Sequence, residues 1–132
     1  MKLSDKSKQR REGVDLRLIE ISDLAIQITV VDFGHPADAG LRTAERQKEL
    51  FDQKLSKADG YKNKSNHQAA KDGLGKALDF YAFVDGKASW KHEHLSMVAC
   101  AFLQAASMLG YKLEWGGLWR GFKDMPHVQI KD

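Results

Sequence analysis

The 132-residue sequence has very little cysteine and no long apolar run. Its one cysteine, Cys100, excludes an internal disulfide, so the fold does not require an oxidising compartment. The apolar neighbours of Cys100 favour a buried small side chain over a nucleophile. No segment approaches the roughly 20 apolar residues that a membrane-spanning helix needs, and no amino-terminal stretch has the pattern of a secretory signal. We therefore expect synthesis in the cytoplasm and no stable membrane association.

The sequence also has only a small excess of charge of one sign, with 21 Lys and Arg against 18 Asp and Glu. The hydrophobic fraction of 42% is typical of a globular chain and excludes wholesale disorder. This length favours one domain over residues 1–132, with a monomer as the default. The small basic excess gathers in residues 2–11, which favours a polyanion such as nucleic acid or cell-wall polymer. The alternative is a solvated helix start within residues 1–13.

Hydrophobic periodicity predicts a small α+β domain. Apolar residues recur at spacings of three and four over residues 14–30 and 92–109, and Thr43 is a good cap for a helix over about 44–55. Short alternating or apolar runs predict strands in 30–34, 77–84, 88–90, 111–115 and 127–130, with a tight hairpin turn at 85–87. We expect a central antiparallel sheet with helices mainly on one side. The polar stretch 56–76 has no periodicity, which is typical of a functional or disordered segment.

The five histidines differ in their promise as metal ligands. His35 precedes a proline in a loop, so a surface position is expected. His92 and His94 lie two apart at the start of a helix and point in different directions, which predicts solvent-facing or capping roles. His67 lies in the polar stretch, and His127 begins the last predicted strand.

Three of the polar side chains form a possible metal site. If the strands of Asp79 and His127 are neighbours, both can project from one sheet face, with His67 brought over them. Two histidines and a carboxylate leave a fourth position for water on a catalytic zinc. Asp124, three residues before His127, is then a candidate base. The alternative is a polar loop with ordinary acids.

Arg42 stands just before a predicted helix start. Its planar guanidinium could hold a substrate carboxylate. The alternative is an arginine on the surface beside the helix.

Three separated sequence blocks resemble the zinc peptidases of the D-Ala-D-Ala carboxypeptidase and VanY type, the M15 family. They are most similar to the phage endolysins that act as L-alanyl-D-glutamate endopeptidases. "GLRTAERQKELF" is similar to G-x-R-[ST]-x-x-x-Q-x-x-L, and "SNH" with "GKALD" is similar to S-x-H followed by G-x-A-x-D. "WGGLWRGFKDMPH" is similar to W-G-G-x-W-x-x-F-x-D-x-P-H. The blocks span about residues 30–130.

The resemblance implies one Zn²⁺ and a role for each matching residue. His67, Asp79 and His127 correspond to the ligands and Asp124 to the general base. Arg42 corresponds to the residue that holds a substrate carboxylate or polarises the scissile carbonyl. Ser65 corresponds to a supporting residue, and Trp115 and Trp119 to the walls of the substrate site.

One departure from the family pattern concerns the acidic ligand. The acid follows the first histidine by seven residues in that pattern, whereas here Asp79 follows His67 by twelve. Asp72 is nearer but lacks the A-x-D strand context, so Asp79 is the predicted ligand. The extra residues are expected to reshape the substrate groove.

The implied substrate is the peptidoglycan stem peptide, cut between L-Ala and D-Glu after release of the protein to the cell wall. A D-Ala-D-Ala carboxypeptidase of the same fold is the first alternative. A non-enzymatic module that binds the wall or nucleic acid is the second, with residues 2–11 as its contact.

Overall fold

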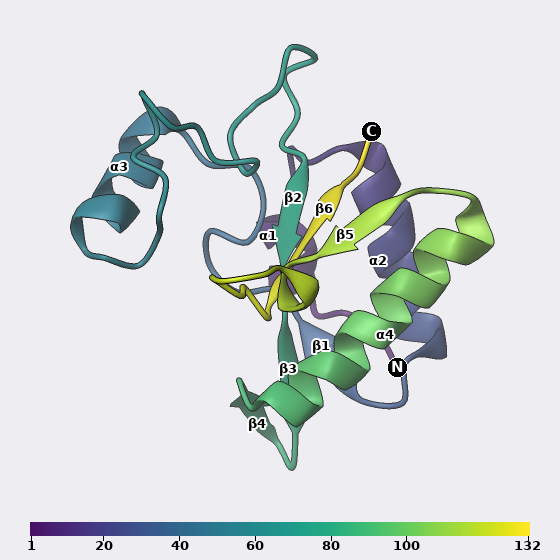
Figure 1. Ribbon diagram of the computed structural model, residues 1–132. Coiled ribbons are helices and arrows are strands. Elements are labelled where there is room, and N and C mark those ends of the chain that lie inside the picture. The colour runs from purple at the N-terminus through teal and green to yellow at the C-terminus, as the bar shows by residue number, and fades with distance from the viewer.

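The computed structural model describes residues 1–132 and contains two short antiparallel sheets of three strands each (Figure 1). One sheet has the order β1-β3-β4 and the other β2-β6-β5. The strands are β1 (Asp32–Gly34), β2 (Ala77–Asp79), β3 (Tyr81–Val84), β4 (Lys87–Ser89), β5 (Leu113–Trp115) and β6 (His127–Ile130). The helices are α1 (Asp5–Arg10), α2 (Leu16–Ile28), α3 (Ala44–Asp52) and α4 (His92–Leu109), with a 3₁₀ turn η1 (Gly116–Leu118). The α+β prediction is confirmed.

Two sheets replace the single central sheet because the run over residues 77–84 breaks at Phe80. The backbone N–H of Phe80 donates to the carbonyl of Pro126 at 2.8 Å, outside both ladders. Its ring is fully buried and stacks on Phe102 of α4 with centroids 5.1 Å apart. Asp79 therefore ends one strand and Tyr81 begins another, so the ligand candidate lies next to a core residue.

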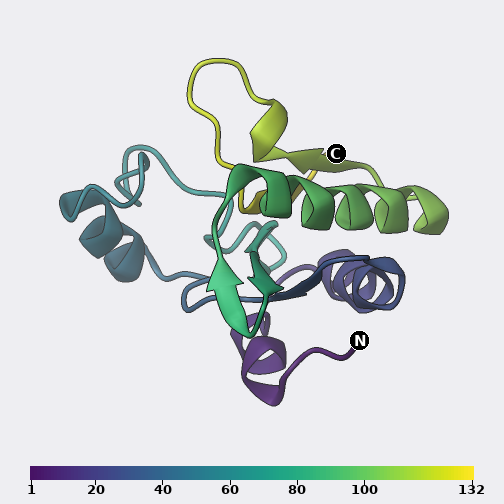
Figure 2. The same ribbon diagram turned by 90° about the horizontal axis from the view of Figure 1, so that it is seen from below.

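Helices α2 and α4 pack against each other and cover the strands from one side. Both views place α3 on the other side of the strands (Figures 1 and 2). The predicted helical spacing is confirmed, since Leu18 and Ile21 of α2 and Val98 and Phe102 of α4 are all buried. Gly110 ends α4 in the left-handed conformation, with φ of 79°, as expected for a C-cap.

One expectation about the helices is wrong. Cys100 is exposed, because it lies on the outer side of α4, near Met97 and Gln104. In the basic start of the chain Lys2, Lys6 and Lys8 are exposed, whereas Arg11 is buried and pairs with Asp23 at 2.7 Å. No helix combines the length and the apolar character needed to cross a membrane.

Candidate active site

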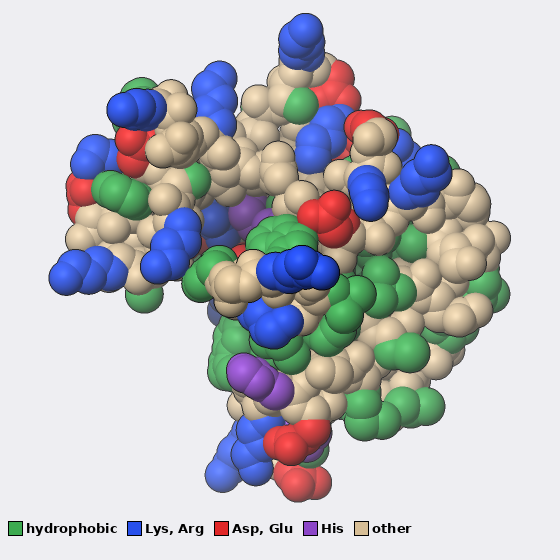
Figure 3. Space-filling view, viewed as in Figure 1, with side chains coloured by type: hydrophobic (Ala, Val, Ile, Leu, Met, Phe, Trp, Pro, Cys, Tyr) green, Lys and Arg blue, Asp and Glu red, His purple; other side chains and the backbone are tan.

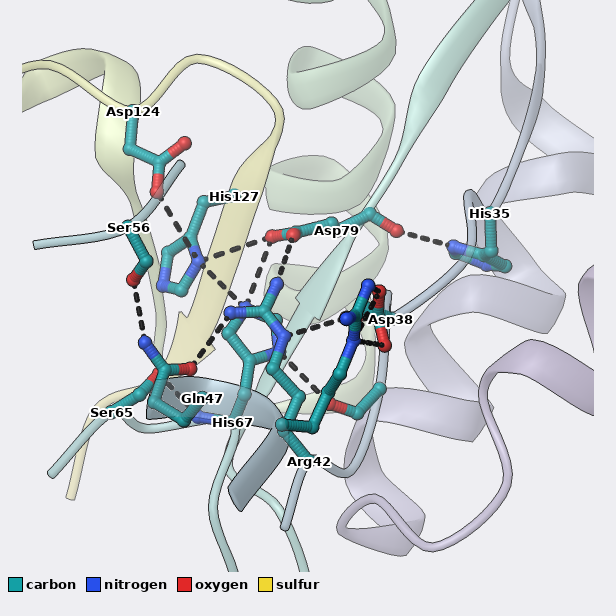
Figure 4. Close-up of polar contacts among 12 residues, drawn as sticks. His35, Asp38, Arg42, Gln47, Ser56, Ser65, His67, Asp79, Asp124 and His127 are labelled. Atoms are coloured by element: carbon teal, nitrogen blue, oxygen red, sulfur yellow. Dashed lines mark hydrogen bonds and ion pairs between the residues drawn. The ribbon is translucent and has the colours of Figure 1, made fainter. Parts of the chain in front are cut away.

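His67, Asp79 and His127 come together at the end of the β2–β6 ladder (Figure 4). Asp79 and His127 face each other in the register of these strands, which confirms that the strands are neighbours. His67 reaches them from the polar stretch 56–76. Its backbone carbonyl accepts a hydrogen bond from the backbone N–H of Arg42 at 2.8 Å. The three facing atoms, His67 Nε2, His127 Nδ1 and Asp79 Oδ1, are each 3.2 Å from the other two.

The hydrogen bonds of the two imidazoles define their tautomers. His67 Nδ1 donates to the carbonyl of Gly40 at 3.0 Å, so Nε2 carries the lone pair. His127 Nε2 lies 2.8 Å from Gln129 Oε1, so Nδ1 carries the lone pair. Two nitrogen lone pairs and a carboxylate oxygen thus face one another at 3.2 Å without a hydrogen between them. Such a cluster needs a cation at its centre, either a proton or a metal ion.

The donor set fits a zinc ion. Zinc takes imidazole nitrogen and carboxylate oxygen at about 2.0–2.1 Å, and donors in a tetrahedral arrangement then lie about 3.3 Å apart. The observed separations of 3.2 Å are close to this value. All three side chains are largely buried, and their ligand atoms share one small volume. The three residues therefore could hold a metal with one position left open.

Asp72, the nearer acid in the sequence, lies outside this cluster. It is exposed and pairs with Lys76. The extra residues after His67 turn back on themselves, with Ala70 N–H donating to the carbonyl of Leu74 at 2.9 Å. None of residues 69–76 lines the cavity at the metal site, so the extra residues do not form its wall.

A chain of hydrogen bonds behind His127 was not foreseen from the sequence. Gln129 directs its amide oxygen to His127 because its amide nitrogen donates to Glu114 Oε2 at 3.3 Å. Glu114 Oε2 also accepts from Trp119 Nε1 at 2.7 Å. The contact between Gln129 and His127 could have been predicted from the sequence. Residues two apart in a strand share a face, and these two lie on one face of β6.

Asp124 lies beside the cluster, with Oδ2 3.7 Å from His127 Nδ1. Burial raises the pKa of Asp124, which brings this carboxyl closer to the neutral range that suits a general base. Its backbone N–H donates to the carbonyl of Gly116 at 3.0 Å. A Cβ at Gly116 would overlap the backbone of Asp124, and one at Gly117 would overlap the indole of Trp115. These glycines therefore make room for the backbone of Asp124 and the indole of Trp115.

Burial and neighbouring charges have opposite effects on the pKa values of Asp79 and His127. Burial acts to raise the pKa of Asp79, but His67 and His127, when they are protonated in place of a bound metal, outweigh burial through their charges and hydrogen bonds and hold this pKa well below its usual range. Burial likewise acts to lower the pKa of His127, and the carboxylate of Asp79 reverses the effect and raises it. Asp79 is therefore ionised at neutral pH and supplies the negative charge that attracts a cation.

Arg42 points into the site, so the alternative of a surface arginine is wrong. Its Nη2 donates to Asp79 Oδ2 at 3.1 Å, and its Nη1 donates to Gln47 Oε1 at 3.1 Å. Its Nε donates to the carbonyl of Asp38 at 2.9 Å. All three guanidinium nitrogens have protein partners, and only 11% of the side chain is exposed.

His35 supports the backbone of Asp79, and the predicted surface position is wrong. Its Nδ1 donates to the carbonyl of Asp79 at 2.7 Å, and its Nε2 accepts from the hydroxyl of Ser22 at 2.9 Å. Burial lowers the pKa of His35 to about 4, so the ring is neutral at pH 7. His92 is exposed, and His94 Nδ1 contacts Ser89 Oγ at 2.7 Å. Neither histidine belongs to the metal cluster.

The remaining candidates surround a cavity of about 410 Å³ that opens beside the metal cluster. Trp119 and Ser65 line it, and Ser65 Oγ also accepts from the backbone N–H of His67 at 3.1 Å. Trp115 does not line it: this indole donates to the carbonyl of Met125 at 2.7 Å and packs against the core. Trp115 is thus a supporting residue only. Figure 3 shows histidine side chains in the hollow between the part of the molecule that contains α3 and the rest of it.

Fold and site together are those of a small α+β peptidase with room for a metal ion. The family model of the phage L-alanyl-D-glutamate peptidases matches residues 1–131, and the chain belongs to this family. The crystal structure of the Serratia marcescens L-Ala D-Glu endopeptidase ChiX is similar over 98% of this chain and 90% of that chain, with a TM-score of 0.81 and 30% sequence identity. A search of curated proteins gives no match.

Proposed function

We propose that the protein is a zinc-dependent endopeptidase that cuts the L-Ala-D-Glu bond of the peptidoglycan stem peptide after its release to the cell wall. The observation that carries the proposal is the triangle of lone-pair atoms from His67, Asp79 and His127, each 3.2 Å from the others. Family membership and the similarity to ChiX support the substrate.

Each residue of the site has a part in this reaction. A zinc ion held by the two histidines and Asp79 would polarise the scissile carbonyl and make a water acidic near neutral pH. Asp124 lies beside these ligands and would accept a proton from the attacking water. When the C–N bond breaks, Asp124 returns the proton to the leaving amine. Arg42 lines the cavity and keeps its positive charge near the developing oxyanion.

Arg42 also positions the carboxylate ligand. Its bond to Asp79 Oδ2 leaves Oδ1 directed at the two histidines. Since His35 holds the carbonyl of the same residue, both the backbone and the side chain of Asp79 are constrained. A constrained ligand set is what a metal site requires before the ion arrives.

The test is digestion of purified peptidoglycan with zinc-loaded protein, chelator-treated protein and protein to which zinc has been restored. We expect soluble peptides with new D-Glu amino termini by mass spectrometry in the first and third digests only. Asp124→Asn should retain one zinc per chain and lose turnover by at least about a hundredfold. Asp52→Asn, on the exposed side of α3, is the matched control and should act as wild type.

Other products would identify the alternatives. Release of terminal D-Ala alone indicates the carboxypeptidase, and an intact wall with no stoichiometric zinc indicates a binding module. Full activity of Asp124→Asn would refute its role as the base.

A further inference from the structure

The cavity beside the metal cluster contains two lysines that have no acidic partner. Its charged lining residues are Arg42, Lys57, Lys64, Asp79 and Asp124. Arg42 is paired with Asp79, whereas neither Lys57 nor Lys64 has a carboxylate within 4.0 Å. Both ammonium groups are therefore available to a bound anion.

Lys57 lies on a backbone that is fixed to the metal site. The amide nitrogen of the fully buried Gln47 donates to Ser56 Oγ at 2.6 Å and to the carbonyl of Ala58 at 2.8 Å, on either side of Lys57. The amide oxygen of Gln47 accepts from Arg42. Figure 4 shows this connection from Ser56 through Gln47 to Arg42. The position of Lys57 is thus tied to the residue that contacts Asp79.

Lys57 also contacts an aromatic residue of the same cavity. Its Nζ lies 5.3 Å from the centroid of the Phe122 ring, and both residues line the cavity. This contact holds the ammonium at the cavity lining while leaving its hydrogens free to donate.

A second buried glutamine fixes the backbone next to Lys64. Gln68 Oε1 accepts from the backbone N–H of Ser65 at 2.9 Å, and Gln68 Nε2 donates to the carbonyl of Gly60 at 2.9 Å. Gln68 directly follows His67, so the backbone next to Lys64 is also connected to a residue of the metal cluster.

A glutamyl residue within a peptide retains one free carboxylate, since only the other is used in the chain. Arg42 cannot readily be its partner, because all three of its nitrogens already have protein acceptors. We infer that Lys57 and Lys64 form a carboxylate subsite that recognises the free carboxylate of the D-Glu residue next to the cleaved bond. The inference rests on the proposed function and names the group of the substrate that these lysines bind.

The experiment compares two synthetic stem peptides that differ only in this group, one with the free D-Glu carboxylate and one with its carboxamide. Wild-type protein should cleave the carboxylate peptide with a kcat/KM about tenfold higher, as expected for a partly exposed charge-assisted bond. Lys57→Gln with Lys64→Gln should lower kcat/KM for the carboxylate peptide about tenfold, mainly through KM, and leave the amide peptide unchanged. Lys62→Gln, in the same segment but outside the cavity lining, is the matched control and should keep the wild-type ratio.

A binding measurement separates this inference from the proposed function. Zinc-loaded Asp124→Asn should bind the carboxylate peptide more tightly than the amide by calorimetry, and the two lysine changes should remove the difference. If wild type cleaves neither peptide but the binding preference depends on the lysines, the proposed reaction fails and the subsite stands. An unchanged preference in the double lysine variant, in turnover or in binding, would overturn the subsite.

Discussion

Replacement of Gln129 by leucine removes the acceptor that fixes the tautomer of His127. The lost bond is 2.8 Å long and lies in a region where only 7% of the His127 side chain is exposed. A buried N–H without an acceptor costs about 1–3 kcal/mol, and loss of such an outer partner lowers metal affinity about 10–100-fold. The two estimates agree, since each factor of ten corresponds to about 1.4 kcal/mol. We therefore expect Gln129→Leu to weaken zinc binding about 10–100-fold.

The assay is competition for zinc against a chromophoric chelator, combined with ¹⁵N NMR of the imidazole nitrogens. The wild-type ring should carry its hydrogen on Nε2, and Gln129→Leu should shift His127 toward the other tautomer. Gln129→Glu keeps an acceptor for His127 but loses the donor to Glu114, so it should bind zinc more tightly than Gln129→Leu. Gln104→Leu, exposed on α4, is the control for the change in side-chain type. Wild-type zinc affinity and an unchanged tautomer in Gln129→Leu would refute the role of this residue.

Three further outcomes follow from the structure. Gly116→Ala should displace Asp124, so we expect at least about a tenfold fall in kcat with zinc still stoichiometric by elemental analysis, and normal turnover would contradict this. His35 titrates at about 4 in the fold and 6.5 when unfolded, so its contribution is complete above pH 6.5 and is lost as the pH falls toward 4. The loss is about 3 kcal/mol, and urea unfolding of metal-free wild type and His35→Asn at pH 7 and pH 4 should show it only in wild type. Phe102→Ala should lower the free energy of unfolding by about 3–5 kcal/mol in the same assay, and a loss under about 1 kcal/mol would argue against the stacked core.

The sequence predicted those parts of the site that depend on local pattern. Alternation predicted Asp79 and His127 on strands, and the pairing of β2 with β6 in register, which could only be assumed from the sequence, brings them together. The helical spacing over residues 92–109 likewise predicted an apolar face, and Phe102 on that face is buried. These features follow from periods of two and 3.6 residues, which are properties of a short segment.

The parts that escaped prediction depend on contacts between distant segments. His35 was expected at the surface, yet its partners are Ser22 and the carbonyl of Asp79, from two other elements. The break at Phe80 arises because Pro126 offers a carbonyl and Phe102 offers a stacking partner. No local pattern specifies such partners, so a polar residue in a loop is assigned to solvent by default.

The single thiol of Cys100 has a practical use. It is exposed on α4, and the groove around it shares no residue with the lining of the metal-site cavity. A maleimide dye would therefore attach at one defined point without engineered cysteines. Labelled lysine variants and wild type could then be followed on intact cell-wall sacculi under the microscope, which separates adsorption to the wall from hydrolysis of it.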